Sequence, residues 1–299
     1  RDTLAAPRVA VACAAATAAL GALGILAGGT GIGPIHSSAP SQPLIAGWVG
    51  AALVLLGCGS VLLVAGAGRP AHRRGAIAAA LLVAAAAGLA LVALLTRSAF
   101  DLDLLARVLG LPRPAYSWAT HPLAPIAVAA AAAALLWLAT GRDRSVAGAL
   151  ALVPALSGIT ITFGALYGTP VFVVGGWEPL SFVAGLGGAL LGSGLIAAAG
   201  PEAWPLRLMA GNSVQAMLLR WFLPLIVLVV VVTDVATIKF FSGISHALGS
   251  VLNSVISVIA VGVVVYYLAR VIGGRLDRAE RAASRLNRLY TVVTRINEA

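Results

Sequence analysis

The sequence predicts an all-α integral membrane protein with eight transmembrane helices, arranged as four two-helix hairpin units and ending in a cytoplasmic coiled-coil helix. Two observations predict this fold class. Hydrophobic residues make up 60% of the 299 residues and charged residues only 10%, which is too little polar surface to coat a soluble globule. Apolar runs of about 18 to 25 residues also recur along the chain, and each is long enough to cross a hydrocarbon core of about 30 Å.

The expected spans follow one another from near the start of the chain. They are residues 9–32, 44–67, 76–96, 123–140, 146–167, 180–200, 218–238 and 251–271. The first is too long, and runs on too directly into the next segment, to be a cleaved signal peptide. Residues 1–271 therefore form the predicted transmembrane domain. Residues 272–299 form a separate helix that stops in mid-pattern, so we expect it to lead into a further domain.

The basic residues predict the orientation. If the N-terminus is cytoplasmic, sixteen of the twenty Lys and Arg residues fall on the inner side. The four on the outer side are Arg97, Arg107, Arg113 and Lys239. Because basic residues concentrate in cytoplasmic loops, both termini are predicted to lie inside. We therefore attribute the net charge of +10 to basic residues on the inner side of the membrane, and no nucleic-acid partner is expected.

The hairpins resemble one another. A proline at position 43, 122 or 179 opens each of three returning spans, and each span continues into a segment with two adjacent leucines and ends at a glycine. The paired leucines are Leu55-Leu56, Leu135-Leu136 and Leu190-Leu191. This pattern favours repeats of one two-helix unit, with the last pair diverged. The alternative is that proline starts and glycine stops are common in membrane helices generally.

One ionisable residue lies inside an expected span. Asp234 is placed in the outer leaflet of the seventh span, where a charged side chain is costly and is by default a functional candidate. Asn253 and Ser257 of the eighth span, with Thr160 and Thr162 of the fifth, reach comparable depth. We therefore predict a polar sensing pocket around Asp234. The alternative is a neutral Asp234 that holds helices together through hydrogen bonds.

A heptad pattern follows the last span. Apolar residues occupy its a positions at Ile272, Ala279, Leu286 and Val293. This spacing predicts a coiled coil and hence a homodimer through residues 272–296. Gly273 and Gly274 lie where the last span passes into this coiled-coil seam, and a glycine pair could form a hinge there. The alternative is an amphipathic helix on the anionic inner membrane surface.

The remaining signals concern packing. Gly24 and Gly28, and likewise Gly188 and Gly192, lie four residues apart, a spacing that lets two helix backbones approach closely. Cys13 and Cys58 fall inside apolar spans and are predicted to be unpaired. The histidines lack ligand spacing, so neither a metal site nor a cofactor is predicted.

The outer stretches 99–105 and 165–170 and the closing residues 276–299 resemble the N-terminal membrane region of bacterial sensor proteins. Residues 289–299, Leu-Tyr-Thr-Val-Val-Thr-Arg-Ile-Asn-Glu-Ala, are similar to the helix that leads into a GAF or PAS domain. The resemblance implies a sensor in the bacterial inner membrane, with a histidine kinase or diguanylate cyclase domain following it in the same chain. It brings no catalytic residue, so the residues present are not predicted to form an enzyme. Transport and a structural role remain alternatives.

Overall fold

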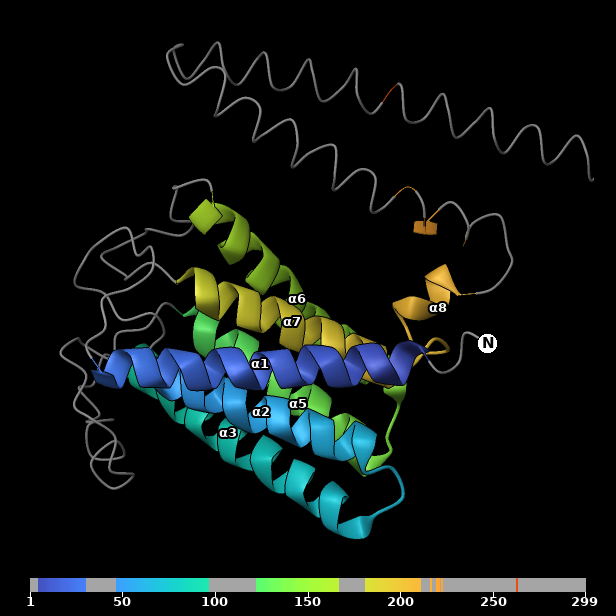
Figure 1. Ribbon diagram of the computed structural model, residues 1–299, viewed down its shortest axis with the longest axis horizontal. Coiled ribbons are helices and arrows are strands. Elements are labelled where there is room, and N and C mark those ends of the chain that lie inside the picture. The colour runs from blue at the N-terminus through green and yellow to red at the C-terminus, as the bar shows by residue number, and fades with distance from the viewer. Residues whose placement is uncertain are drawn as a thin grey trace, which may run out of the picture. The chain divides into compact units, whose positions relative to one another are not determined.

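The computed structural model describes residues 5–30, 47–96, 122–166 and 181–210, with a few isolated positions beyond. The regular structure in these ranges is entirely α-helical (Figure 1). The helices are α1 (Ala5–Thr30), α2 (Gly47–Ala65), α3 (Pro70–Thr96), α5 (Leu123–Thr140), α6 (Arg144–Leu166), α7 (Phe182–Ala199) and the short α8 (Leu206–Met209). The chain divides into two compact units, Arg1–Met217 and Leu218–Ala299, and all of these helices belong to the first.

Six of these helices, all except α8, are long and apolar enough to cross a membrane. They coincide with the first six expected spans, so this part of the prediction is confirmed. The expected spans at 218–238 and 251–271 and the heptad segment 272–299 lie outside the described residues.

The third span begins earlier than the sequence predicted. Position 76 was its expected start, whereas α3 begins at Pro70. Proline suits the first position of a helix because the N–H that it lacks would have no partner in the helix there. As a result, Arg73 and Arg74 lie on the first turn of α3 and not in a loop. Because of this earlier start, Arg73 is held on α3 at a position from which it bonds to the end of α5.

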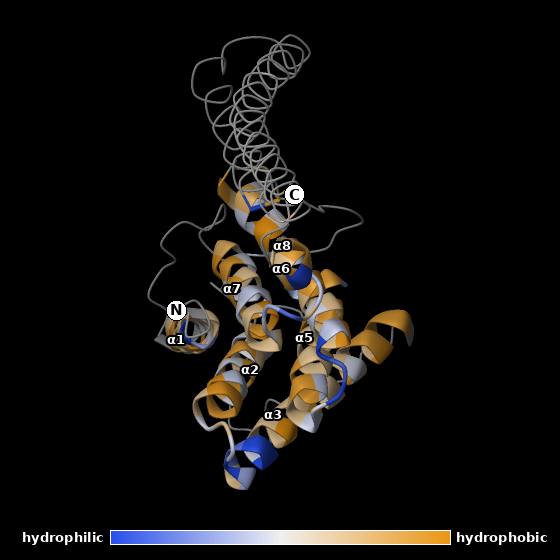
Figure 2. Ribbon diagram, turned by 90° about the vertical axis from the view of Figure 1, so that its right-hand side faces the viewer, coloured by the Kyte–Doolittle hydropathy of each residue, from blue (hydrophilic) through white to orange (hydrophobic). Residues whose placement is uncertain are grey.

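The six long helices form a cyclic arrangement, which Figure 2 shows close to end-on. Helices α2, α5 and α7 contact one another at the centre. Each outer helix packs on two of these inner helices: α1 on α2 and α7, α3 on α5 and α2, and α6 on α7 and α5. Every outer helix therefore packs on the inner helix that follows it in the chain and on the inner helix of a neighbouring pair. Three copies of one two-helix unit would produce this arrangement.

Two further features repeat around the centre. Leu56, Leu135 and Leu191, one from each inner helix, are fully buried in a single apolar core. Within three residues after each inner helix, a glycine has positive φ: Gly68 at 92°, Gly141 at 73° and Gly200 at 92°. Because residues with a Cβ rarely adopt this conformation, glycine is needed where each helix ends. A fourth unit would fall outside the described residues.

The closest helix contact joins α6 to α7. A Cβ added at Gly158 would lie 2.2 Å from the backbone nitrogen of Ala189, and one added at Gly192 would lie 2.4 Å from that of Ala155. Either distance is far inside van der Waals contact, so the two backbones touch only because these positions are glycine. Gly188 also faces this contact, since a Cβ added there would lie 3.4 Å from the carbonyl oxygen of Pro154.

Candidate functional site

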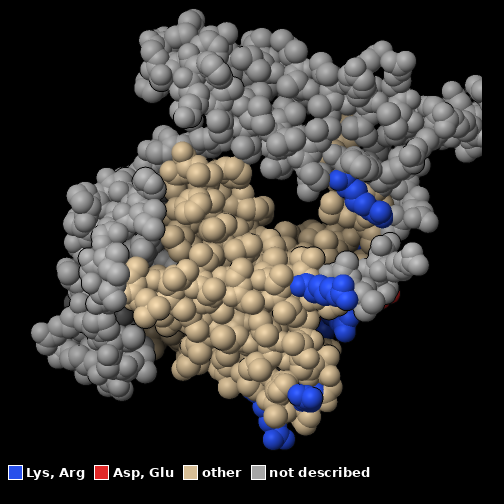
Figure 3. Space-filling view, viewed as in Figure 1, with Lys and Arg blue, Asp and Glu red and all other residues tan. Residues whose placement is uncertain are grey.

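Charge is confined to one end of the six-helix bundle. In the described residues of the first unit, every Arg lies near the start of α1, in or beside the turns that follow α2 and α5, or in α8, and Figure 3 shows these side chains gathered at that end. They are Arg8, Arg69, Arg73, Arg74, Arg142, Arg144 and Arg207. The described residues at the opposite end carry no charge.

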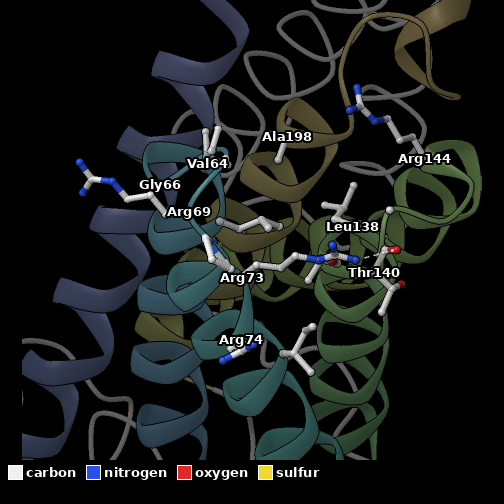
Figure 4. A pocket seen from close by; sticks show the side chains of 16 residues that line it. Val64, Gly66, Arg69, Arg73, Arg74, Leu138, Thr140, Arg144 and Ala198 are labelled. Atoms are coloured by element: carbon white, nitrogen blue, oxygen red, sulfur yellow. Dashed lines mark hydrogen bonds between the residues drawn. The ribbon is translucent and has the colours of Figure 1, made fainter.

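A cleft of about 940 Å³ opens at this charged end. It is bounded by the end of α2, the start of α3, the end of α5, the first residue of α6 and the last turn of α7 (Figure 4). Its apolar lining comprises Leu63, Val64, Ile77, Leu138 and Ala198, and its basic lining comprises Arg69, Arg73, Arg74 and Arg144. Among the described residues that line it, none is acidic. We refer to it as the basic cleft.

One wall of the basic cleft is the C-terminal end of α5. Here the backbone N–H of Gly141 donates to the carbonyl oxygen of Leu138, and that of Arg142 donates to Trp137, both at 3.2 Å. With Gly141 in the left-handed conformation, this is a Schellman motif, which satisfies carbonyls that the helix leaves open. The Arg142 guanidinium lies 5.1 Å from the centre of the Trp137 ring. Arg142 is therefore stacked on α5 and does not line the cleft.

Arg73 fixes α3 to the same helix end. Its Nε donates to the carbonyl oxygen of Ala139, and its Nη2 donates to that of Thr140 at 3.1 Å, as Figure 4 shows. A cation at a helix C-terminus bonds open carbonyls and interacts favourably with the helix dipole. Arg73 thus has a structural role, although it is also one of the residues that line the cleft.

The other three arginines of the cleft, Arg69, Arg74 and Arg144, are exposed. Their side chains make neither an ion pair nor a hydrogen bond with the described part of the chain. The acid next to Arg144 in sequence, Asp143, caps α6 by accepting the backbone N–H of Ser145 at 2.8 Å. Within the described residues, therefore, none of these three arginines forms an ion pair with a carboxylate.

The role of Arg73 gives a direct stability prediction. We expect Arg73→Gln to lower the free energy of unfolding by about 1 kcal/mol, because α5 loses a charged group bonded to its last carbonyls. Arg74→Gln is the matched control, since it removes the same charge from the next residue without removing a bond to α5. The measurement is unfolding in mixed micelles of neutral detergent and sodium dodecyl sulfate. Equal unfolding curves for the two variants would contradict the assignment.

The structure places the two predicted threonines on different sides of α6. Thr160 is exposed and its hydroxyl donates to the carbonyl oxygen of Leu156 at 2.9 Å, whereas the Thr162 hydroxyl donates to that of Gly158 at 2.7 Å and faces α7. Residues two apart on a helix are separated by about 200°. In the described structure, therefore, the two hydroxyls are not brought together into one pocket.

Most of the other predicted site residues lie outside the described part of the chain. These are Asp234, Asn253, Ser257, Ile272, Gly273, Gly274, Ala279, Leu286 and Val293. Of the predicted packing glycines, Gly188 and Gly192 face α6, Gly24 is buried in α1, and Gly28 lies in the last turn of α1. The described residues contain no cluster of three potential metal ligands.

The sequence did not reveal the basic cleft. In the sequence these arginines indicate only orientation, and a span that starts at position 76 leaves Arg73 and Arg74 outside any helix. A usable signal was the stretch Gly68-Arg69-Pro70, in which proline after a glycine stop starts the next helix and brings the basic residues that follow onto its first turn.

Six long apolar helices, with charge at one end of their bundle, indicate a helical membrane protein. No protein-family model matches the chain, and no curated protein or solved structure matches it significantly.

Proposed function

We propose that the protein is a membrane-embedded signal-transduction module. Its transmembrane domain, residues 1–271, receives an extracytoplasmic or intramembrane stimulus. The helix 272–299 then passes the change to a cytoplasmic output domain, in a homodimer. The observation that carries this proposal is the heptad pattern that directly follows an uncharged span, with Ile272, Ala279, Leu286 and Val293 on one seam. A membrane helix that continues into a dimer seam transmits rotation or translation directly.

The core of the described bundle weighs against transport, the main alternative. Its buried polar side chains are Thr17 and Ser60. Both bond to their own helices, Thr17 to the carbonyl oxygen of Cys13 at 2.8 Å and Ser60 to that of Leu56 at 2.7 Å. A transport route needs polar groups that are free to replace the hydration of the solute. At the described centre, which is filled mainly by leucine and alanine, the two buried hydroxyl groups are not free in this way.

The charge distribution supports the orientation within this proposal. The basic end of the bundle faces the cytoplasm of a bacterial inner membrane, as basic segments do in membrane proteins. An even number of spans returns a chain to the side on which it began, and the proposal has eight. The helix 272–299 therefore follows the last span on the cytoplasmic side.

Disulfide crosslinking in native membranes tests the relay. Single cysteines are placed in turn along 272–296 of the full chain, with both native cysteines replaced by alanine. We expect crosslinking to peak about every three to four residues, with maxima at 272, 279, 286 and 293. The matched control is a chain that retains only Cys58, which is exposed on α2 and outside the seam. A flat profile would overturn the dimeric relay and favour a structural or transport subunit.

A further inference from the structure

We propose that the basic cleft binds the phosphate group of an anionic amphiphile, namely the headgroup of an anionic phospholipid at the membrane surface. This inference rests on the geometry of the cleft and is independent of the proposed signalling function. Its first basis is charge. Arg69 follows α2, Arg74 belongs to α3 and Arg144 begins α6, so three separate elements contribute basic residues to the lining of one cleft. None of the three is paired within the described residues.

Hydrogen bonding to the open carbonyls of a helix end does not account for these three arginines. Arg73 performs that task for α5 through its two bonds to terminal carbonyls. The side chains of Arg69, Arg74 and Arg144 bond to no helix terminus in the described structure. Guanidinium groups are well suited to phosphate because their N–H donors match its oxygens in pairs. Arg73, already held in place, has further N–H groups that are not used by α5.

The second basis is the shape and polarity of the cleft. The lining of the cleft also includes apolar side chains, among them Leu63, Ile77 and Leu138. A molecule that carries both a phosphate and hydrocarbon chains satisfies both surfaces at once. The cleft is also at the ends of membrane-spanning helices, which is the level of lipid headgroups. Its volume of about 940 Å³ exceeds what a phosphate ion needs and lies in the range of small-molecule sites.

The test uses native mass spectrometry of the full chain in a neutral detergent. The chain is titrated with phosphatidylglycerol, and in parallel with phosphatidylcholine that carries the same acyl chains. The cleft variant is Arg69→Gln/Arg74→Gln/Arg144→Gln, in which Arg73 is kept because it holds α5. The matched control is Arg8→Gln/Arg142→Gln/Arg207→Gln, which removes three charges from the same end but none from the cleft. Thermal unfolding without lipid checks that both variants fold.

We expect one phosphatidylglycerol molecule to bind preferentially per chain. Its Kd should rise about tenfold or more in the cleft variant and less than about twofold in the control variant, since the basic lining of the cleft is lost only in the former. Equal weakening in both variants would overturn the proposal, because it would show general attraction to a basic surface. Equal binding of phosphatidylcholine would also overturn it.

A second arm distinguishes the source of the phosphate. Sodium phosphate is added to the unmodified chain at an ionic strength matched with sodium chloride, and the thermal unfolding midpoint is measured. Two results together would assign the site to free phosphate. Phosphate would raise the midpoint of the unmodified chain but not that of the cleft variant, and the chain would show no preference for phosphatidylglycerol. If the triple variant fails to fold, Arg144→Gln and Arg142→Gln form the replacement pair. Equal phosphatidylglycerol binding by these two single variants would contradict the proposal.

Discussion

Gly158→Leu is expected to force α6 away from α7 and to lower the free energy of unfolding by about 3 kcal/mol. The added Cβ alone would lie 2.2 Å from the backbone nitrogen of Ala189 and 2.5 Å from the carbonyl oxygen of Gly185. Backbone atoms cannot rotate out of the way as the end of a side chain can. The helices must therefore separate, and the neighbouring contacts of Gly192 are lost with them.

The matched control for this variant is Gly88→Leu in α3. A Cβ at Gly88 would meet nothing within 4 Å, so the same side chain enters open space. Because leucine is a better helix former than glycine, this variant should be equal to the unmodified protein or more stable by up to about 1 kcal/mol. The measurement is the unfolding midpoint in mixed micelles containing sodium dodecyl sulfate. Similar midpoints for both variants would contradict the close approach of α6 and α7.

Leu135→Ala is expected to lower the free energy of unfolding by about 3 kcal/mol. Leu135 is 0% exposed at the centre of the inner helices, and its Cδ2 lies 3.0 Å from where a Cβ would stand on Gly59 of α2. Removing three carbons there leaves a cavity among helices that already touch. The leucines and valines of the same core are already packed against one another and cannot fill it fully.

Leu82→Ala in α3 is the control for this second prediction. Leu82 is 60% exposed, so lipid or detergent fills the space that its side chain leaves. We expect a change below about 1 kcal/mol, since no protein cavity forms. The same unfolding titration compares the two. If Leu82→Ala proved as destabilising as Leu135→Ala, the burial pattern of the inner helices would be wrong.

The positions of the spans could be predicted because length and apolarity alone define a membrane helix. Which face each helix buries could not be predicted, because these helices are apolar on every side. Leu156 and Gly158 of α6 illustrate this point: both are apolar, yet Leu156 is 58% exposed and Gly158 touches α7. Inside a membrane the buried face is distinguished by small size and not by hydrophobicity.

The candidate site was harder to predict, for a different reason. Arg73 bonds to the carbonyl oxygen of Ala139, a residue 66 positions away. The periodicity of a single helix does not indicate such a distant partner. The start of α3 was also misplaced, which removed Arg73 and Arg74 from any helix. The predictions made for Asp234 and for the heptad segment 272–296 stay predictions.

The cyclic packing of α1 against α7 links the beginning of the first unit to its end. Gly194 of α7 lies against α1, with the Cβ of Cys13 3.1 Å from where its own Cβ would stand. During synthesis, α1 enters the membrane long before α7 has been translated. Until then, the face of α1 that α7 will cover has no partner within the bundle, and lipid must occupy it. The completion of this ring is therefore a late event in biogenesis, timed by the arrival of Phe182–Ala199 in the bilayer.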